Sequence, residues 1–262
     1  MISPEKQTKV FADTAEIKHI YDLLQQNLPI DGVTTNPSLL AKALGGIKLT
    51  PEELDNKYYD LLREIRKILP DGSISGEIFV KPESTKEEIY RMANEMSEAV
   101  ENIHVKIPIF PAGLEAAADF VKDGGKVNMT LCFSLDQARA VDLLTEGLAK
   151  KGQVYVSPFV GRLDDIGLRG MSLIENIHAD FTLRKAKTCL LAASIRSRDQ
   201  FDSCMALGID MVTVPPKILF EWNGKRLKNI PFSQYTDNLN IKHSLTDKGF
   251  DSFVKARESL LK

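Results

Sequence analysis

The sequence contains little of what marks secreted, membrane or metal-binding proteins. Only three of its 262 residues are cysteines, and Cys132, Cys189 and Cys204 form neither a CxxC pair nor another metal-ligand spacing. We therefore expect buried free thiols, as in a reducing cytoplasm. The four histidines also lack a metal-ligand spacing. No apolar run approaches the roughly 20 residues of a membrane span, and the polar start lacks the apolar core of a signal peptide. These absences predict a cytoplasmic protein without a metal or other cofactor.

A charge excess of one sign is also missing. The formal net charge is -2, which gives no reason to expect a nucleic acid or an anionic membrane as partner. No Pro/Gly/Ser-rich linker, low-complexity tract or composition break divides the chain. Because 43% of the residues are hydrophobic, the chain can bury a sizeable core. We predict one domain over residues 1–262, with a C-terminal extension from about residue 220.

What the chain does contain is an alternation of β-rich apolar runs with segments of helical spacing. Eight runs are typical of strands, and they lie at 10–14, 32–36, 73–80, 104–110, 126–132, 153–159, 187–193 and 211–215. Helix-start signals stand between them, such as those at 13–16, 50–53, 84–88 and 134–137. An open doubly wound sheet would more often stop at five or six strands. The pattern predicts an α/β fold, a (β/α)8 TIM barrel with a C-terminal helix.

Lys106 stands inside one of these apolar runs, His-Val-Lys-Ile-Pro-Ile-Phe at 104–110. Burial disfavours the ammonium form of a lysine, so the neutral amine becomes available to attack a carbonyl carbon as a Schiff-base nucleophile. Alternatively, a strand-end lysine can reach solvent or pair with a carboxylate. The barrel context favours the Schiff-base interpretation, because catalytic groups of such barrels lie at strand ends.

Polar residues stand at or just beyond the carboxyl end of every predicted strand but the last. They are Asp13, Asn36, Glu77, Lys106, Asn128, Thr130, Ser157, Arg162, Ser194 and Arg196. Any single one could be a structural strand end or helix cap, and Asp13 and Ser194 are the easiest to explain as caps. Alternate positions of a strand share a face, so Asn128 and Thr130 are expected to point inward together. As a set, these residues predict an active site at this end of the barrel.

Six motifs in this order resemble the transaldolases and the closely related fructose-6-phosphate aldolases, which are metal-free Schiff-base enzymes on a (β/α)8 barrel. The motifs are Phe-Ala-Asp-Thr-Ala at 11–15, Asp-Gly-Val-Thr-Thr-Asn-Pro-Ser-Leu at 31–39, Val-Lys-Ile-Pro at 105–108, Tyr-Val-Ser-Pro-Phe-Val-Gly-Arg at 155–162, Leu-Ala-Ala-Ser-Ile-Arg at 191–196 and Leu-Thr-Asp-Lys-Gly at 245–249. Each motif alone is weak evidence, but their order and spacing over most of the chain are specific.

The resemblance implies a role for each candidate residue. Lys106 would add to the ketone carbon of a ketose phosphate, and Asp13 would take the proton from the hydroxyl on the fourth carbon. Glu77 and Thr130 would hold the water that moves protons while the iminium forms and hydrolyses. The implied substrate-binding residues are Asn36, Asn128 and Ser157 for the three-carbon unit, Phe159 beside the catalytic water, and Arg162, Ser194 and Arg196 for the phosphate.

The resemblance also bears on the reaction type. A transaldolase passes a dihydroxyacetone unit to a second aldose phosphate, whereas the aldolase releases it. Phe159 stands where the aldolase pattern has tyrosine, Glu77 where it has glutamine, and Asn128 is transaldolase-like. These residues favour a transaldolase of the pentose phosphate pathway, with sedoheptulose 7-phosphate or fructose 6-phosphate as donor and glyceraldehyde 3-phosphate or erythrose 4-phosphate as acceptor. A dihydroxyacetone-releasing aldolase and a non-catalytic barrel that binds sugar phosphates stay open as alternatives.

The chain departs from the family pattern after the eighth strand. Two prolines, Pro215 and Pro216, replace the usual one, and residues 220–243 look inserted. With Trp222, Phe232 and Tyr235 among polar residues, this insertion is first interpreted as a solvated or packing loop, with a lid or an oligomer contact as alternatives. An amphipathic tail follows. In compact relatives such a tail helix crosses to a neighbouring subunit of a ring, so we expect a homo-oligomer.

Overall fold

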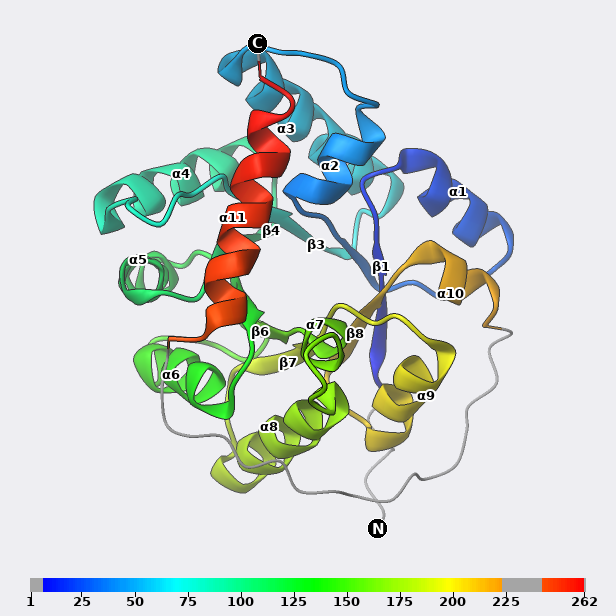
Figure 1. The fold of residues 1–262 in the computed structure, drawn as a ribbon, viewed down its shortest axis with the longest axis vertical. Coiled ribbons are helices and arrows are strands. Elements are labelled where there is room, and N and C mark those ends of the chain that lie inside the picture. The colour runs from blue at the N-terminus through cyan, green and yellow to red at the C-terminus, as the bar shows by residue number, and fades with distance from the viewer. Residues whose placement is uncertain (1–6, 223–241, 262) are drawn as a thin grey trace.

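Eight parallel strands form a closed barrel in the computed structural model of the protein (Figure 1). The structure describes residues 7–222 and 242–261. The strands are β1 (Lys9–Asp13), β2 (Gly32–Thr34), β3 (Ser73–Glu77), β4 (Ile103–Pro108), β5 (Val127–Cys132), β6 (Val154–Pro158), β7 (Cys189–Ala192) and β8 (Met211–Val214). Each strand pairs with its sequence neighbours, and β1 also pairs with β8, which closes the sheet. The predicted (β/α)8 barrel is confirmed.

Helices surround the barrel, and several begin where the sequence predicts. They are α1 (Ile17–Gln25), α2 (Pro37–Ala43), α3 (Pro51–Ile68), α4 (Lys86–Ala99), α5 (Pro111–Lys122), α6 (Leu135–Thr145), α7 (Val160–Asp164), α8 (Gly170–Arg184), α9 (Arg198–Leu207), α10 (Pro216–Phe220) and α11 (Ser244–Glu258). Thr50 and Thr85 form capping boxes at the starts of α3 and α4, and Ser134 caps α6. The alternative interpretation of Asp13 as a helix cap is wrong, because α1 begins four residues later and its N-cap residue makes no side-chain bond.

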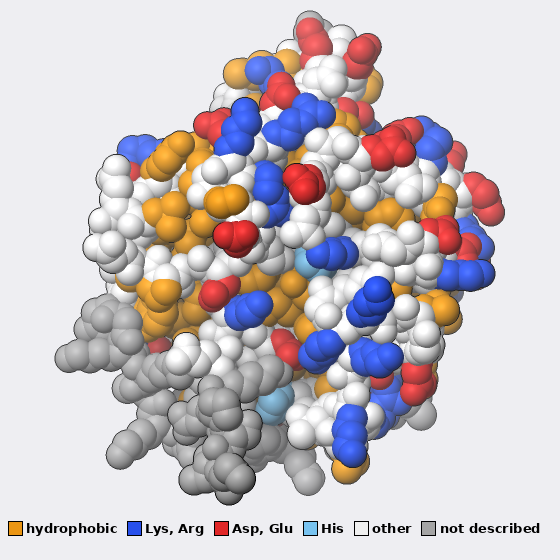
Figure 2. All heavy atoms as spheres, turned by 180° about the vertical axis from the view of Figure 1, so that it is seen from behind, with side chains coloured by type: hydrophobic (Ala, Val, Ile, Leu, Met, Phe, Trp, Pro, Cys, Tyr) orange, Lys and Arg blue, Asp and Glu red, His pale blue; other side chains and the backbone are white. Residues whose placement is uncertain are grey.

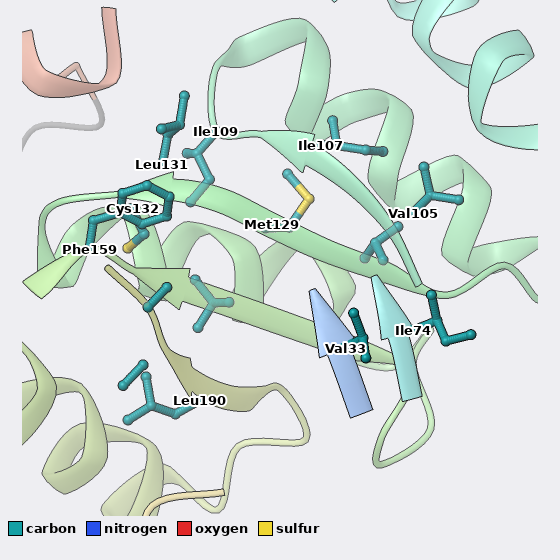
Figure 3. Packing of buried hydrophobic residues seen from close by; sticks show 14 of the residues in the cluster. Val33, Ile74, Val105, Ile107, Ile109, Met129, Leu131, Cys132, Phe159 and Leu190 are labelled. Carbon is teal, nitrogen blue, oxygen red and sulfur yellow. The ribbon is translucent and has the colours of Figure 1, made fainter. Parts of the chain in front are cut away.

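The apolar residues of the strands fill two separate regions. Val105 and Ile107 of β4 belong to a large cluster that packs the strands against the helices, part of which Figure 3 shows. A smaller cluster contains Phe11, Tyr155 and Met211. On β1, Phe11 belongs to the smaller cluster and its neighbours to the larger one, as the period of two requires. The smaller cluster therefore lies inside the barrel, and the inward side chains beyond it toward the strand ends are polar.

α11 crosses the barrel at the end where the strands terminate (Figure 1). It packs against α2 and β5, and Phe250 and Phe253 bury their rings there. Just beyond α11, the backbone N–H of Leu49 donates to the carbonyl of Leu260 at 2.7 Å, and Leu49 and Leu261 form an isolated bridge. The amphipathic tail predicted from the sequence is therefore a helix on its own barrel, whereas the number of subunits stays a prediction.

The segment predicted as an insertion lies largely outside the described residues, as do Phe232 and Tyr235. Trp222 is described and buried, and its ring centroid lies 5.3 Å from that of Phe201. Pro216 occupies the first turn of α10, a position where proline costs no hydrogen bond.

One face of the described surface is mixed in charge. Seen from the side opposite to Figure 1, Lys and Arg side chains lie among Asp and Glu side chains (Figure 2). Within residues 7–222 and 242–261, every helix is too short or too polar to cross a bilayer. The three cysteines are buried and free, as predicted. Burial raises the pKa of the Cys132 thiol to about 12, so this thiol stays protonated at neutral pH.

Candidate active site

A polar pocket of about 250 Å³ opens at the carboxyl ends of the strands. The structure brings nearly all the predicted site residues together here, namely Asp13, Asn36, Lys106, Asn128, Thr130, Ser157, Phe159, Arg162, Ser194 and Arg196. Glu77 lies outside this lining and contacts Lys106 directly. Every strand but β3 and β7 contributes a side chain from within the strand or its last residue, so the closed barrel converts distant sequence positions into one site.

Lys106 is held at the base of the pocket by two partners. Its side chain is 6% exposed, its Nζ donates to the backbone carbonyl of Thr35 at 2.9 Å, and it lies 3.1 Å from Glu77 Oε2. Glu77 is 1% exposed, and burial raises the pKa of its carboxyl, while the charge of Lys106 works in the opposite direction. A buried carboxyl that can carry or release a proton thus stands beside the amine.

Asp13 ends β1 and takes part in a hydrogen-bond chain across three strands. Thr34 Oγ1 donates to Asp13 Oδ1 at 2.7 Å, and it lies 2.6 Å from Thr213 Oγ1. Because a hydroxyl has one proton, Thr34 accepts from Thr213 while it donates to Asp13. Burial raises the pKa of Asp13, and the charge of Lys106 and the Thr34 hydrogen bond partly offset this rise. These two hydrogen bonds fix the orientation of one carboxylate oxygen of Asp13.

Side chains of β5 and β6 form a second polar group. Ser157 Oγ donates to Asn128 Oδ1 at 2.6 Å, and Asn128 Nδ2 donates to Ser75 Oγ at 3.1 Å. Thr130 faces the same pocket as Asn128, which confirms that both point inward. Among the described residues, the buried Thr130 Oγ1 has no hydrogen-bond partner, so it can accept and donate to a water or a substrate hydroxyl.

Two arginines stand at the outer side of the pocket in different environments. Arg196 forms a two-contact ion pair with Asp165, one of whose distances is 2.7 Å. Arg162 makes no hydrogen bond or ion pair with the described residues; instead its guanidinium lies 5.2 Å from the ring centroid of Phe159 and 5.5 Å from that of Phe253. Burial lowers the pKa of Arg162, but an arginine in water titrates so high that it stays charged.

Some sequence interpretations need correction. Asn36 also caps α2, with Oδ1 accepting from the Leu39 N–H at 3.0 Å. Arg162 lies in the short helix α7, which follows β6. Ser194 is no helix cap; it adopts a left-handed conformation with φ 57°, and Ser197 caps the next helix.

The pocket is also lined by Thr34, Thr213 and Phe253, which were not predicted from the sequence. The last strand does contribute to the pocket, through Thr213. Threonine is a good strand former, so its presence in a strand indicates no particular function. Only the alternation with Met211, which places both side chains inside the barrel, could have indicated that Thr213 lines the pocket. Phe253 belongs to the predicted apolar face of the tail, but the sequence does not tell which surface that face covers.

The pocket and Glu77 beside it supply proton donors, bases and charged groups. Within residues 7–222 and 242–261, no three His, Cys, Asp or Glu side chains are grouped as a metal ion requires. The residues at hand are one buried amine, two carboxyl groups, several hydroxyls and two guanidinium groups. They fit a substrate with a carbonyl, hydroxyls and an anionic group.

The sequence matches the transaldolase/fructose-6-phosphate aldolase family over residues 10–262. A protein of Chelativorans sp. (strain BNC1) named "Probable transaldolase" is 36% identical over 246 residues, which cover 94% of each chain. A protein of Lysinibacillus sphaericus (strain C3-41) with the same name is 37% identical over 246 residues, which cover 94% of this chain and 95% of that one.

Among solved structures, an enolase from the environmental genome shotgun sequencing of the Sargasso Sea is similar with a TM-score of 0.52 and 12% identity. The match covers 80% of this chain and 55% of that one. This chain therefore spans about half the length of the enolase, and the likeness concerns the barrel alone.

Proposed function

Since the chain belongs to the transaldolase/fructose-6-phosphate aldolase family, we propose that it is a transaldolase that acts through a Schiff base on Lys106. The observation that carries the proposal is the buried ion pair of Lys106 with Glu77 in a pocket that Asp13 also lines. A carboxyl of raised pKa beside a buried lysine can exchange protons with it while the amine adds to a ketone. The proposed donors are sedoheptulose 7-phosphate or fructose 6-phosphate, and the acceptors glyceraldehyde 3-phosphate or erythrose 4-phosphate, as in the pentose phosphate pathway.

The first step is formation of the Schiff base. The Lys106 amine adds to the second carbon of the ketose, and the carbonyl oxygen leaves as water to give an iminium. Glu77, 3.1 Å from the amine, supplies and removes the protons of this step, with Thr130 holding the water. Metal is not required for any of these proton transfers.

The second step breaks the bond between the third and fourth carbons. Asp13 takes the proton of the hydroxyl on the fourth carbon, an aldose phosphate leaves, and the electrons of the broken bond form an enamine on the lysine. Asn128 and Ser157, already linked by a 2.6 Å hydrogen bond, bind the hydroxyls of the three-carbon unit, together with Asn36. Arg162, Ser194 and Arg196 hold the phosphate. The enamine then attacks the aldehyde of the acceptor, whose oxygen receives the proton from Asp13, and hydrolysis frees the new ketose.

The same site could release dihydroxyacetone, as a fructose-6-phosphate aldolase does, if water protonated the enamine readily. Phe159 argues for transfer, because its ring packs 5.6 Å from that of Phe133 and beside Arg162, and it offers no hydroxyl to a water. We expect Phe159→Tyr to raise release of free dihydroxyacetone. If Phe159→Tyr leaves that release unchanged, Phe159 does not discriminate between the two reactions.

The decisive experiment is borohydride reduction of the protein mixed with fructose 6-phosphate, followed by mass spectrometry of the intact chain and of the Lys106 peptide. A three-carbon adduct on Lys106 is expected, and erythrose 4-phosphate should deplete it. An adduct that the acceptor does not deplete favours the aldolase. No adduct with fructose 6-phosphate, nor with sedoheptulose 7-phosphate in a parallel sample, favours the alternative from another class, a non-catalytic barrel that binds sugar phosphates.

A further inference from the structure

The side chain of Arg162 is positioned by aromatic rings and not by hydrogen bonds. Its guanidinium contacts the rings of both Phe159 and Phe253, at 5.2 and 5.5 Å from their centroids, and makes no hydrogen bond or ion pair with the described residues. Ring faces attract a guanidinium without using its N–H groups. No described residue thus accepts a hydrogen bond from Arg162, whereas the donors of Arg196 are shared with Asp165.

α11 brings one of these two rings to the site. Phe253 is 6% exposed and lines the polar pocket although it follows β8 by about 40 residues. Gly249, one turn earlier, faces Arg162 so closely that a Cβ there would stand 2.7 Å from Nη1 and 2.6 Å from the Leu131 side chain. The arginine therefore occupies the space that a larger residue at 249 would need.

The position of α11 is fixed by contacts with the barrel. Thr246 Oγ1 donates to the carbonyl of Leu131 at 3.0 Å and accepts from Gln137 Nε2 at 3.0 Å. Leu131 follows Thr130 at the end of β5, near Phe159 (Figure 3). It has a left-handed backbone, φ 59°, which turns its carbonyl out of the ladder toward α11. The 245–249 motif that the proposed reaction does not use is thus the contact that seats the helix.

We propose that Phe253, seated through Gly249, is a positioning residue that aims Arg162 at the phosphate of the sugar, so that α11 sets the preference of the site for phosphorylated substrates. This inference rests on the proposed function, because it assumes that Arg162 binds the phosphate. A long arginine side chain samples many rotamers in solution, and two flanking rings restrict them before the anion arrives. The ring at 253 contributes phosphate affinity without touching the reacting carbons.

The test compares Phe253→Leu with two controls. Phe253→Tyr keeps the ring, and Phe250→Leu removes an equally buried ring of the same helix that packs on Phe110, with centroids 4.9 Å apart, and does not line the polar pocket. The readout is the ratio of kcat/KM for erythrose 4-phosphate to kcat/KM for unphosphorylated glyceraldehyde as acceptor. The second readout is the inhibition constant of inorganic phosphate. Neither quantity depends on the fraction of each variant that is folded.

We expect Phe253→Leu to lower the ratio, and to raise the inhibition constant of phosphate, by about threefold to thirtyfold. Phe253→Tyr and Phe250→Leu should keep wild-type values. An unchanged ratio in Phe253→Leu, or an equal fall in Phe250→Leu, would overturn the inference. Absence of a borohydride-trapped adduct in the wild-type protein would instead refute the proposed function, so the two failures are distinct.

Discussion

Replacing Thr34 by valine tests whether Asp13 is the base, and whether the hydroxyl chain controls it. Valine has nearly the same shape as threonine but cannot donate the 2.7 Å hydrogen bond to Asp13 Oδ1. It also leaves Thr213 Oγ1 without its acceptor. The rest of the pocket keeps its packing, so the perturbation is confined to the chain of hydroxyls.

The sign of the effect follows from the charge of the group. On our proposal Asp13 works as a base in its ionised form, so activity falls as the pH drops through its pKa. Burial already raises the pKa of Asp13, and the Thr34 hydrogen bond works against that rise. Without the hydrogen bond, the pKa rises further, and the acid limb of the pH profile moves to higher pH.

The magnitude follows from the kind of hydrogen bond. A hydrogen bond to a charged group contributes about 1.5 to 3 kcal/mol, and about 1.4 kcal/mol corresponds to a factor of ten in the ionised fraction. Because Asp13 faces an open pocket where water replaces part of the loss, the lower end applies. At a fixed pH on the acid limb, kcat/KM should fall by roughly tenfold and recover at higher pH.

The assay is kcat/KM for fructose 6-phosphate and erythrose 4-phosphate as a function of pH. Thr34→Ser keeps the hydroxyl and should retain the wild-type acid limb. If Thr34→Val still forms the borohydride-trapped adduct but shows its acid limb at the wild-type pH, the assignment of Asp13 or of its hydroxyl chain is wrong.

Three further variants probe the site and its support. Glu77→Gln removes the carboxyl beside Lys106 at nearly constant volume, and single-turnover borohydride trapping should show adduct formation slowed about 10²- to 10⁴-fold. A wild-type rate of adduct formation would show that Glu77 is not the proton carrier. Tyr58→Phe deprives the buried N–H of Glu77 of its 2.8 Å acceptor, so urea unfolding should show a loss of about 1 to 3 kcal/mol, and unchanged stability would contradict the reasoning. Arg66 donates to five backbone carbonyls, so Arg66→Lys should lower the thermal midpoint by a few degrees at constant kcat; a variant that melts like the wild type would refute this.

The barrel and most of its polar pocket could be predicted from the sequence for a simple reason. Strand side chains alternate between two faces, and parallel strands in a closed barrel end at one rim. We therefore expected the side chains of Lys106, Asn128 and Thr130 to meet in one pocket, and they do.

What the sequence did not predict depends on contacts between distant elements. Thr34 and Thr213 are 179 positions apart and meet because β1 lies between their strands. Each alone is an ordinary strand residue. Phe253 was recognised as apolar, but the crossing direction of α11, which places it on Arg162, follows from packing on β5 and α2. Asn36 lines the pocket as predicted and also caps α2, a second role that the helix-start pattern Asn-Pro indicates.

The late position of α11 has a consequence for how the protein is made. The eighth strand ends at Val214, so a nascent chain can close its barrel while the residues of α11 are still inside the ribosome. The tail then reaches back to the early part of the chain, where Lys48 Nζ donates to the carbonyl of Ser259 across 211 positions. On our proposal, a newly made molecule is first a folded barrel with Lys106 in place. It acquires its full affinity for the phosphate of the substrate only when α11 docks.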